Sequence, residues 1–161
     1  MAEKPGLGQV LERHPFFADM PPEVRAVLAG CASLVRVRAG EAIYREGEPA
    51  DEFYLVREGR VGVEVHVPGR DPLVVETLLP GDILGWASLL PPYRWLFDAR
   101  AIDDARLIRL DATCLRSKSE AEPAIGYALY RRFLPAVSRQ LRSARVRLAD
   151  LYGRPVPRQA P

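Results

Sequence analysis

The sequence predicts a mainly β fold with added helices: an antiparallel double-stranded β-helix (jelly roll) with N-terminal helices and a long C-terminal helix. Between residues 31 and 110, roughly eight short apolar segments alternate with glycine and proline turns at spacings of about 8–12 residues, which is typical of a sandwich or roll. After residue 111 the apolar pattern changes to the three- and four-residue spacing of a helix. No strand–helix–strand alternation occurs, so the sequence does not favour a parallel α/β sheet.

A length of 161 residues suits a single domain, which we expect to cover the whole chain, 1–161. A first helical turn begins at Val10 and ends near His14. A second helix starts at Pro22 and ends at Gly30, since proline suits a first turn and glycine a helix end. The expected divisions are N-terminal helices at 1–30, the roll at 31–110, C-terminal helices at 111–153 and a tail at 154–161.

The clearest strand of the predicted roll covers residues 61–67. Valines at every second position alternate with Gly62, Glu64 and His66, a period of two that indicates a strand with one face buried. A turn at 68–71 leads into the returning strand. The further strands are expected at 34–38, 42–44, 53–56, 73–78, 97–101 and 106–110.

The C-terminal region predicts a short helix and then a long one. Asp111 is a good N-cap for a helix over 113–118, and Pro123 suits the first turn of the next. We expect Pro135 to kink or split that long helix. Residues 130–151 carry a heptad-like seam, which favours a homodimer contact, whereas packing of the helix on its own domain stays open as the alternative. The seam consists of Tyr130, Leu134, Val137, Leu141, Ala144, Leu148 and Leu151.

The clearest charge asymmetry of the sequence lies near its C-terminus. The net charge of +2 implies no particular partner, but residues 131–158 hold eight arginines and only one acid, Asp150. This basic stretch is either a solvated helix face or a surface for an acidic protein or nucleic acid. No signal peptide or long apolar run occurs, so we expect a cytoplasmic protein without a membrane segment.

Nothing in the sequence predicts catalytic or metal chemistry. The two histidines, His14 and His66, are far apart, and neither lies near a cysteine in the sequence. No nucleophile elbow, P-loop or dinucleotide fingerprint is present. Cys31 and Cys114 make neither a disulfide framework nor a metal cluster, and we expect both to behave as small core residues. We therefore expect a protein that is not an enzyme, with no catalytic residue and no metal site.

Three glycine-punctuated segments resemble the cyclic nucleotide-binding domain family, which includes Crp/Fnr-type regulators and the regulatory subunits of cAMP-dependent kinases. These segments are 38–48 (RAGEAIYREGE), 53–61 (FYLVREGRV) and 79–85 (LPGDILG). The resemblance covers about residues 10–152 and implies a jelly roll that serves as a sensor or regulatory module.

The resemblance also implies a phosphate-binding cassette at residues 85–99. In the family, a glutamate after the glycine binds the ribose and an arginine pairs with the phosphate. Here Trp86 stands at the glutamate position and Trp95 at the arginine position, while Arg94 lies one residue early. The altered cassette predicts a ligand other than canonical cAMP, either a cyclic nucleotide bound differently or a related anionic or aromatic molecule. The candidate ligand-binding residues are Gly85, Trp86, Ala87, Ser88, Arg94 and Trp95.

The resemblance leaves two functional hypotheses open. The first is a stand-alone sensor or regulatory module, acting on a regulated partner protein. The second is a ligand-free protein-interaction scaffold, in which the two indoles close the pocket. Crp/Fnr-type regulators carry a helix-turn-helix domain after the long helix, whereas this sequence ends about ten residues beyond Leu151. We therefore do not expect sequence-specific DNA binding by this chain alone.

Overall fold

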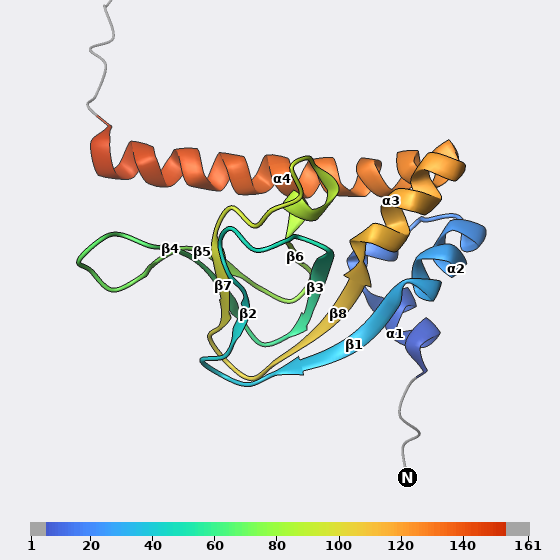
Figure 1. The fold of residues 1–161 in the computed structure, drawn as a ribbon, viewed down its shortest axis with the longest axis horizontal. Coiled ribbons are helices and arrows are strands. Elements are labelled where there is room, and N and C mark those ends of the chain that lie inside the picture. Colours follow the sequence, from blue (N-terminus) through green and yellow to red (C-terminus); the bar gives the residue numbers. More distant parts are fainter. Residues whose placement is uncertain (1–5, 154–161) are drawn as a thin grey trace, which may run out of the picture.

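The computed structural model describes residues 6–153, and within them the chain forms a β-roll with helices at both ends (Figure 1). The strands are β1 (Ala32–Val37), β2 (Ala42–Tyr44), β3 (Glu52–Glu58), β4 (Val61–Val65), β5 (Leu73–Leu78), β6 (Ile83–Leu84), β7 (Asp98–Ala101) and β8 (Ala105–Asp111). They form two antiparallel sheets, in the orders β1-β8-β3-β6 and β2-β7-β4-β5. The predicted fold class is confirmed. The tail at 154–161 lies outside the described residues.

The predicted strands correspond closely to those of the structure, with differences at their ends. Strand β4 pairs with both β5 and β7, and Gly62 and Glu64 are buried as well as Val61 and Val63, so both faces of the strand are covered and not one alone. It ends at Val65, so His66 lies just past the strand. Strand β6 was not predicted, because two residues are too few to show a period.

The N-terminal helices are α1 (Leu7–Arg13), the 3-10 turn η1 (Pro15–Phe17) and α2 (Pro22–Gly30). His14 lies buried between the first two and links them to the roll. Its Nε2 lies 3.1 Å from the Val56 carbonyl, and its Nδ1 accepts a hydrogen bond from the Phe16 amide at 3.2 Å. Because Nδ1 accepts a hydrogen bond it carries no proton, and burial lowers the pKa of His14, which also favours the neutral ring.

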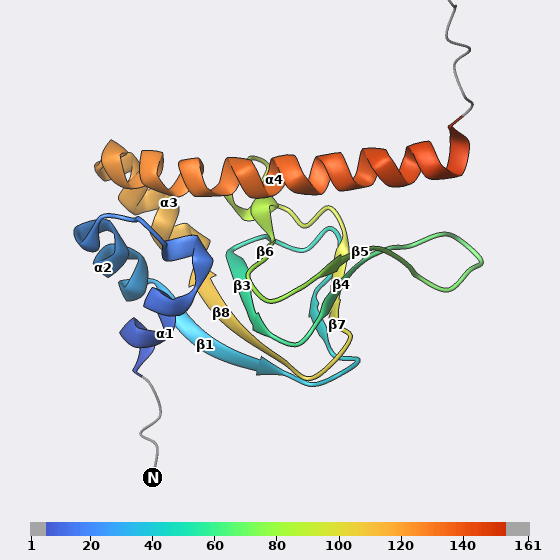
Figure 2. The same cartoon turned by 180° about the vertical axis from the view of Figure 1, so that it is seen from behind.

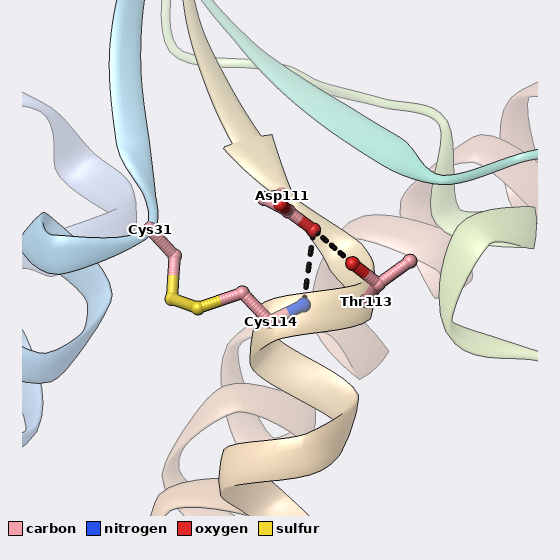
Figure 3. Close-up of a disulfide and its surroundings, with 4 residues drawn as sticks. All are labelled: Cys31, Asp111, Thr113 and Cys114. Carbon is pink, nitrogen blue, oxygen red and sulfur yellow. Dashed lines mark hydrogen bonds between the residues drawn. A yellow bond between two sulfur atoms is a disulfide. The ribbon is translucent and has the colours of Figure 1, made fainter.

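A disulfide joins Cys31 to Cys114, so the expectation that both act simply as small core residues was wrong (Figure 3). Cys31 follows α2, and Cys114 lies in the first turn of α3 (Ala112–Ala121). The antiparallel pairing of β1 with β8 brings the ends of these elements together, with the two Cα atoms 6.1 Å apart. Sequence spacing cannot show this proximity. The predicted N-cap is confirmed, because the Asp111 carboxylate accepts a hydrogen bond from the Cys114 amide at 2.9 Å.

The C-terminal helix α4 (Pro123–Tyr152) runs across one side of the roll as a single element (Figures 1 and 2). It continues through Pro135, so the expectation of a split was wrong. Pro135 is exposed, while Phe133 and Ala136 on either side are buried against the domain. This packing on both sides holds the helix together despite the hydrogen bond that proline cannot make.

The predicted seam of α4 is not the stripe that packs on the roll. The buried positions are Ile125, Gly126, Leu129, Phe133 and Ala136. Most of the seam is instead exposed, with Leu134 67% and Leu148 57% exposed, whereas the Tyr130 hydroxyl donates to the Leu89 carbonyl. Every residue from 141 to 152 is exposed. Dimer formation through this face remains a prediction.

Two large apolar clusters make up most of the core, and a small third cluster contains Ala50, Ala87 and Trp95. One lies between the helices and the sheet that contains β1, and its centre is a group of edge-on aromatic contacts among Phe16, Phe53 and Phe133. The other lies inside the roll around Val61, Leu78 and Leu107. No helix within residues 6–153 is long and apolar enough to cross a membrane.

Candidate functional site

A cavity of about 170 Å³ lies between the roll and α4. The roll contributes Gly85, Trp86 and Trp95 to its walls, and α4 contributes Gln140 and Arg147. The Gln140 amide donates a hydrogen bond to the Ile83 carbonyl at 3.0 Å, which ties the helix to the roll beside the cavity. The cavity therefore joins the predicted cassette to the middle of the long helix.

The indole of Trp95 is a fixed part of this cavity. It is 5% exposed and stacks on Tyr44 with ring centroids 3.8 Å apart and an angle of 9° between the planes. Gly85 has a φ of +91° and lies against the same indole, where a Cβ atom would come within 2.9 Å of ring carbons. Burial raises the pKa of Tyr44, so its ring is neutral in this stack.

Arg94 is directed away from the cavity. The main chain of Trp95 pairs with the loop at residues 47–48: the Gly47 amide donates to the Trp95 carbonyl at 2.9 Å, and the Trp95 amide donates to the Glu48 carbonyl at 3.0 Å. The exposed Arg94 guanidinium donates to the Gly47 carbonyl at 2.8 Å. In this structure Arg94 therefore fastens a loop, and it is not among the residues that line the cavity.

Ser88 lies in the short 3-10 turn η2 (Trp86–Leu89), which is bonded to α3. The Ser88 hydroxyl is fully buried and donates to the Gly85 carbonyl at 2.8 Å. Arg116 of α3 donates to the Ser88 carbonyl, and its guanidinium also lies 4.1 Å from the ring centroid of Tyr93. An ion pair with Asp51 at 3.6 Å completes the contacts of Arg116. These bonds hold the cassette in one conformation.

Two charged residues of the cavity were missed by sequence reasoning. Glu76 comes from β5, and Arg147 comes from the exposed part of α4, where it donates to the Val75 carbonyl. Burial raises the pKa of Glu76, and the nearby Arg147 charge opposes that shift. Nothing in the local sequence marks either residue, because their proximity to the cassette depends on how β5 and α4 pack.

The structure thus brings together part of the predicted site. Gly85, Trp86, Ala87 and Trp95 line the cavity, whereas Ser88 and Arg94 make contacts elsewhere. Among the described residues, no group of three or more histidine, cysteine, aspartate or glutamate side chains is placed to hold a metal ion.

The fold and the site together define a β-roll with a cavity between its strands and its C-terminal helix. The family model of the cyclic nucleotide-binding domain matches residues 34–121. The chain belongs to this family and is a cyclic nucleotide-binding-like regulatory module.

A bacterial regulator is among the known proteins that the chain resembles. The chain is 30% identical over 152 residues to the CRP-like cAMP-activated global transcriptional regulator of Mycobacterium tuberculosis, covering 94% of this chain and 66% of that protein. The chain therefore spans just under two thirds of the length of that relative.

Two solved structures have similar folds. The N-terminal domain of a transcriptional regulator from Streptomyces coelicolor A3(2) is 29% identical, with a TM-score of 0.63 over 86% of this chain and 94% of that one. A cyclic nucleotide-binding domain from Methylobacillus flagellatus has a TM-score of 0.75 over 91% of this chain and 82% of that one, at 18% identity. The second likeness concerns the fold alone.

Proposed function

We propose that this module responds to a ligand other than a canonical cyclic nucleotide, bound in the cavity between the roll and α4. The observation that carries the proposal is Trp95. It stands where the family resemblance places the phosphate-binding arginine, and it is buried in a stack with Tyr44. Arg94, the nearest basic residue in sequence, bonds to Gly47 instead.

This chain lacks two charged contacts of the family, one to the ribose and one to the phosphate. A hydrogen bond to a charged group contributes about 1.5–3 kcal/mol, and every 1.4 kcal/mol changes affinity about tenfold. Trp86 and Trp95 replace both the ribose-binding carboxylate and the phosphate-binding guanidinium of the family. Their joint loss corresponds to an affinity for cAMP about a thousandfold below that of a module with both groups.

Calorimetric titration of the purified protein with cAMP and cGMP tests the proposal. The matched reference is the homologous segment of the M. tuberculosis relative, whose name describes it as cAMP-activated. We expect the reference to bind cAMP and this chain to bind either nucleotide at least a hundredfold more weakly. Comparable affinities in the two proteins would refute the proposal.

The variant Arg94→Ala tests the remaining phosphate partner directly. If Arg94 only fastens the loop at Gly47, its removal leaves any residual cyclic nucleotide affinity unchanged. A drop of tenfold or more would show that Arg94 turns inward to meet the phosphate. That result would restore the anionic-ligand interpretation of the cassette.

A second proposal concerns a homodimer through residues 130–151. Its support is the exposed apolar face of α4, on which Leu134, Leu141 and Leu148 are each at least half exposed. Such a face loses apolar exposed area on pairing with a second copy. We expect a dimer in sedimentation velocity and a monomer for Leu148→Glu, while Arg139→Glu serves as a charge control on the same helix. A monomeric wild type would refute it.

The same exposed face also supports the second candidate function, a ligand-free interaction scaffold. The two candidates differ in their response to ligands. A scaffold binds its partner protein equally well with and without a small molecule in the cavity, and none of the titrations above gives heat. A saturable ligand for the cavity therefore excludes the scaffold.

A further inference from the structure

The cavity of the proposed function also restricts the class of ligand, a conclusion that rests on that proposed function. We propose that the cavity binds an uncharged, planar heteroaromatic molecule of one or two rings that carries both a hydrogen-bond donor and an acceptor. Three independent features carry this proposal: the volume of the cavity, the nature of its walls, and the pair of charges at its edge.

The volume sets the size of the ligand. Sites for drug-sized molecules and cofactors are commonly about 300–1,000 Å³, whereas an engineered apolar cavity of about 150 Å³ holds benzene. The present cavity, at about 170 Å³, is close to the smaller value. The space between its walls therefore suits a ring or a pair of fused rings.

The walls favour a flat apolar surface. Trp86 is half-buried and retains surface toward the cavity, while Trp95 closes the inner side through its stack with Tyr44. Phe97 at the cavity is 40% exposed and adds a further aromatic side chain to its walls. A planar ring placed among these side chains gains both buried area and ring–ring contacts.

The charged side chains restrict the polar edge of the ligand. Glu76 and Arg147 are the charged residues among those lining the cavity. A carboxylate accepts hydrogen bonds and a guanidinium donates them, so together they match a donor and an acceptor on one molecule. A phosphate would be attracted by a single guanidinium, that of Arg147. Repulsion between the phosphate and the Glu76 carboxylate would offset this attraction.

The chain provides its own reporter for the experiment. It has two tryptophans, and both line the cavity, so the tryptophan emission of the protein reports on this site alone. The probes are nicotinamide for one ring, adenine for two, and AMP for a phosphate-bearing form of the same base. We expect saturable changes in emission with nicotinamide or adenine, and binding of AMP that is weaker than that of adenine by about tenfold or more.

Matched variants on one helix test the role of the guanidinium. Arg147→Ala should weaken binding of the better probe about tenfold, because one charge-assisted hydrogen bond is lost. Arg145→Ala changes an exposed arginine that is not among the lining residues, and should leave the affinity unchanged. Circular dichroism melts of both variants establish that each is folded. Equal affinities in the two variants would remove Arg147 from the site and overturn the polar part of the proposal.

The remaining outcomes separate the two proposals. If no probe changes the emission and cAMP also gives no heat, the ligand class is wrong while the loss of canonical nucleotide binding stands. If AMP binds as tightly as adenine, the argument from Glu76 is wrong. If cAMP binds as tightly as it does to the reference segment, both this inference and the proposed function fail.

Discussion

Reduction of the Cys31–Cys114 disulfide should lower the stability of the fold by several kcal/mol. The bond closes a loop over a sequence separation of 83 residues, which includes the whole roll. For a loop of this length, the restriction of the unfolded chain corresponds to about 4.5 kcal/mol at room temperature, and losses of about 2–5 kcal/mol are typical for native disulfides. The structural effect is concentrated where α2 meets α3.

The assay is urea unfolding of oxidised and reduced protein, followed by circular dichroism. We expect a lower midpoint for the reduced protein, with a loss of about 2–4.5 kcal/mol in the free energy of unfolding. The double variant Cys31→Ser, Cys114→Ser should unfold like the reduced wild type and should not respond to reductant. Identical midpoints for the oxidised and reduced wild type would refute the reasoning, as would a double variant as stable as the oxidised protein.

Three further predictions concern buried contacts. The pKa of His14 in the folded protein is below its ordinary value of about 6.5, so the unfolded chain binds more protons. The contribution of His14 to stability is therefore complete above about pH 6.5 and falls as the pH drops below it. His14→Gln should remove this dependence from the urea midpoint. Gly85→Ala combines positive φ with a clash against Trp95 and should cost about 2–5 kcal/mol in thermal unfolding. Arg116→Ala releases the Ser88 carbonyl and should cost about 1–3 kcal/mol by urea unfolding.

Each of these predictions has a control of the same type elsewhere in the chain. His66→Asn changes the other histidine and should keep the acid-side loss of stability. Gly40→Ala imposes a similar positive φ in open space, so a cost equal to that of Gly85→Ala would contradict the clash. Lys118→Ala alters an exposed cation of α3 and should be neutral, and a loss equal to that of Arg116→Ala would contradict the anchoring role.

Much of the fold could be predicted because local chemistry determines it. Strand β4 was predicted from its alternating valines, and the N-cap at Asp111 from the residues that follow it. Both features depend on neighbouring residues alone. The errors arose where distant segments meet. The disulfide depends on the register of β1 and β8, and the continuity of α4 through Pro135 depends on the packing of Phe133 and Ala136.

The site divides in the same way. The position of Trp95 in the cassette could be predicted by counting along the sequence, but its stack with Tyr44 could not, since Tyr44 lies about fifty residues earlier. From the sequence, Arg147 belonged to the basic stretch at 131–158, which was expected to be either a solvated helix face or a surface for an acidic partner. Only the direction of the helix across β5 brings that guanidinium to the cavity.

The length of α4 places its C-terminal end far from the residues that pack on the roll. At 1.5 Å per residue its 30 residues extend about 45 Å. Its buried anchors end at Ala136, the cavity contacts follow between Gln140 and Arg147, and the free arm continues to Tyr152, about 24 Å beyond the last anchor. A tilt of about 10° at Ala136 moves the cavity residues of the helix by about 1–3 Å and moves Tyr152 by about 4 Å. A ligand that displaces the cavity wall by tilting the helix would therefore move Tyr152 further than it moves the residues that it touches.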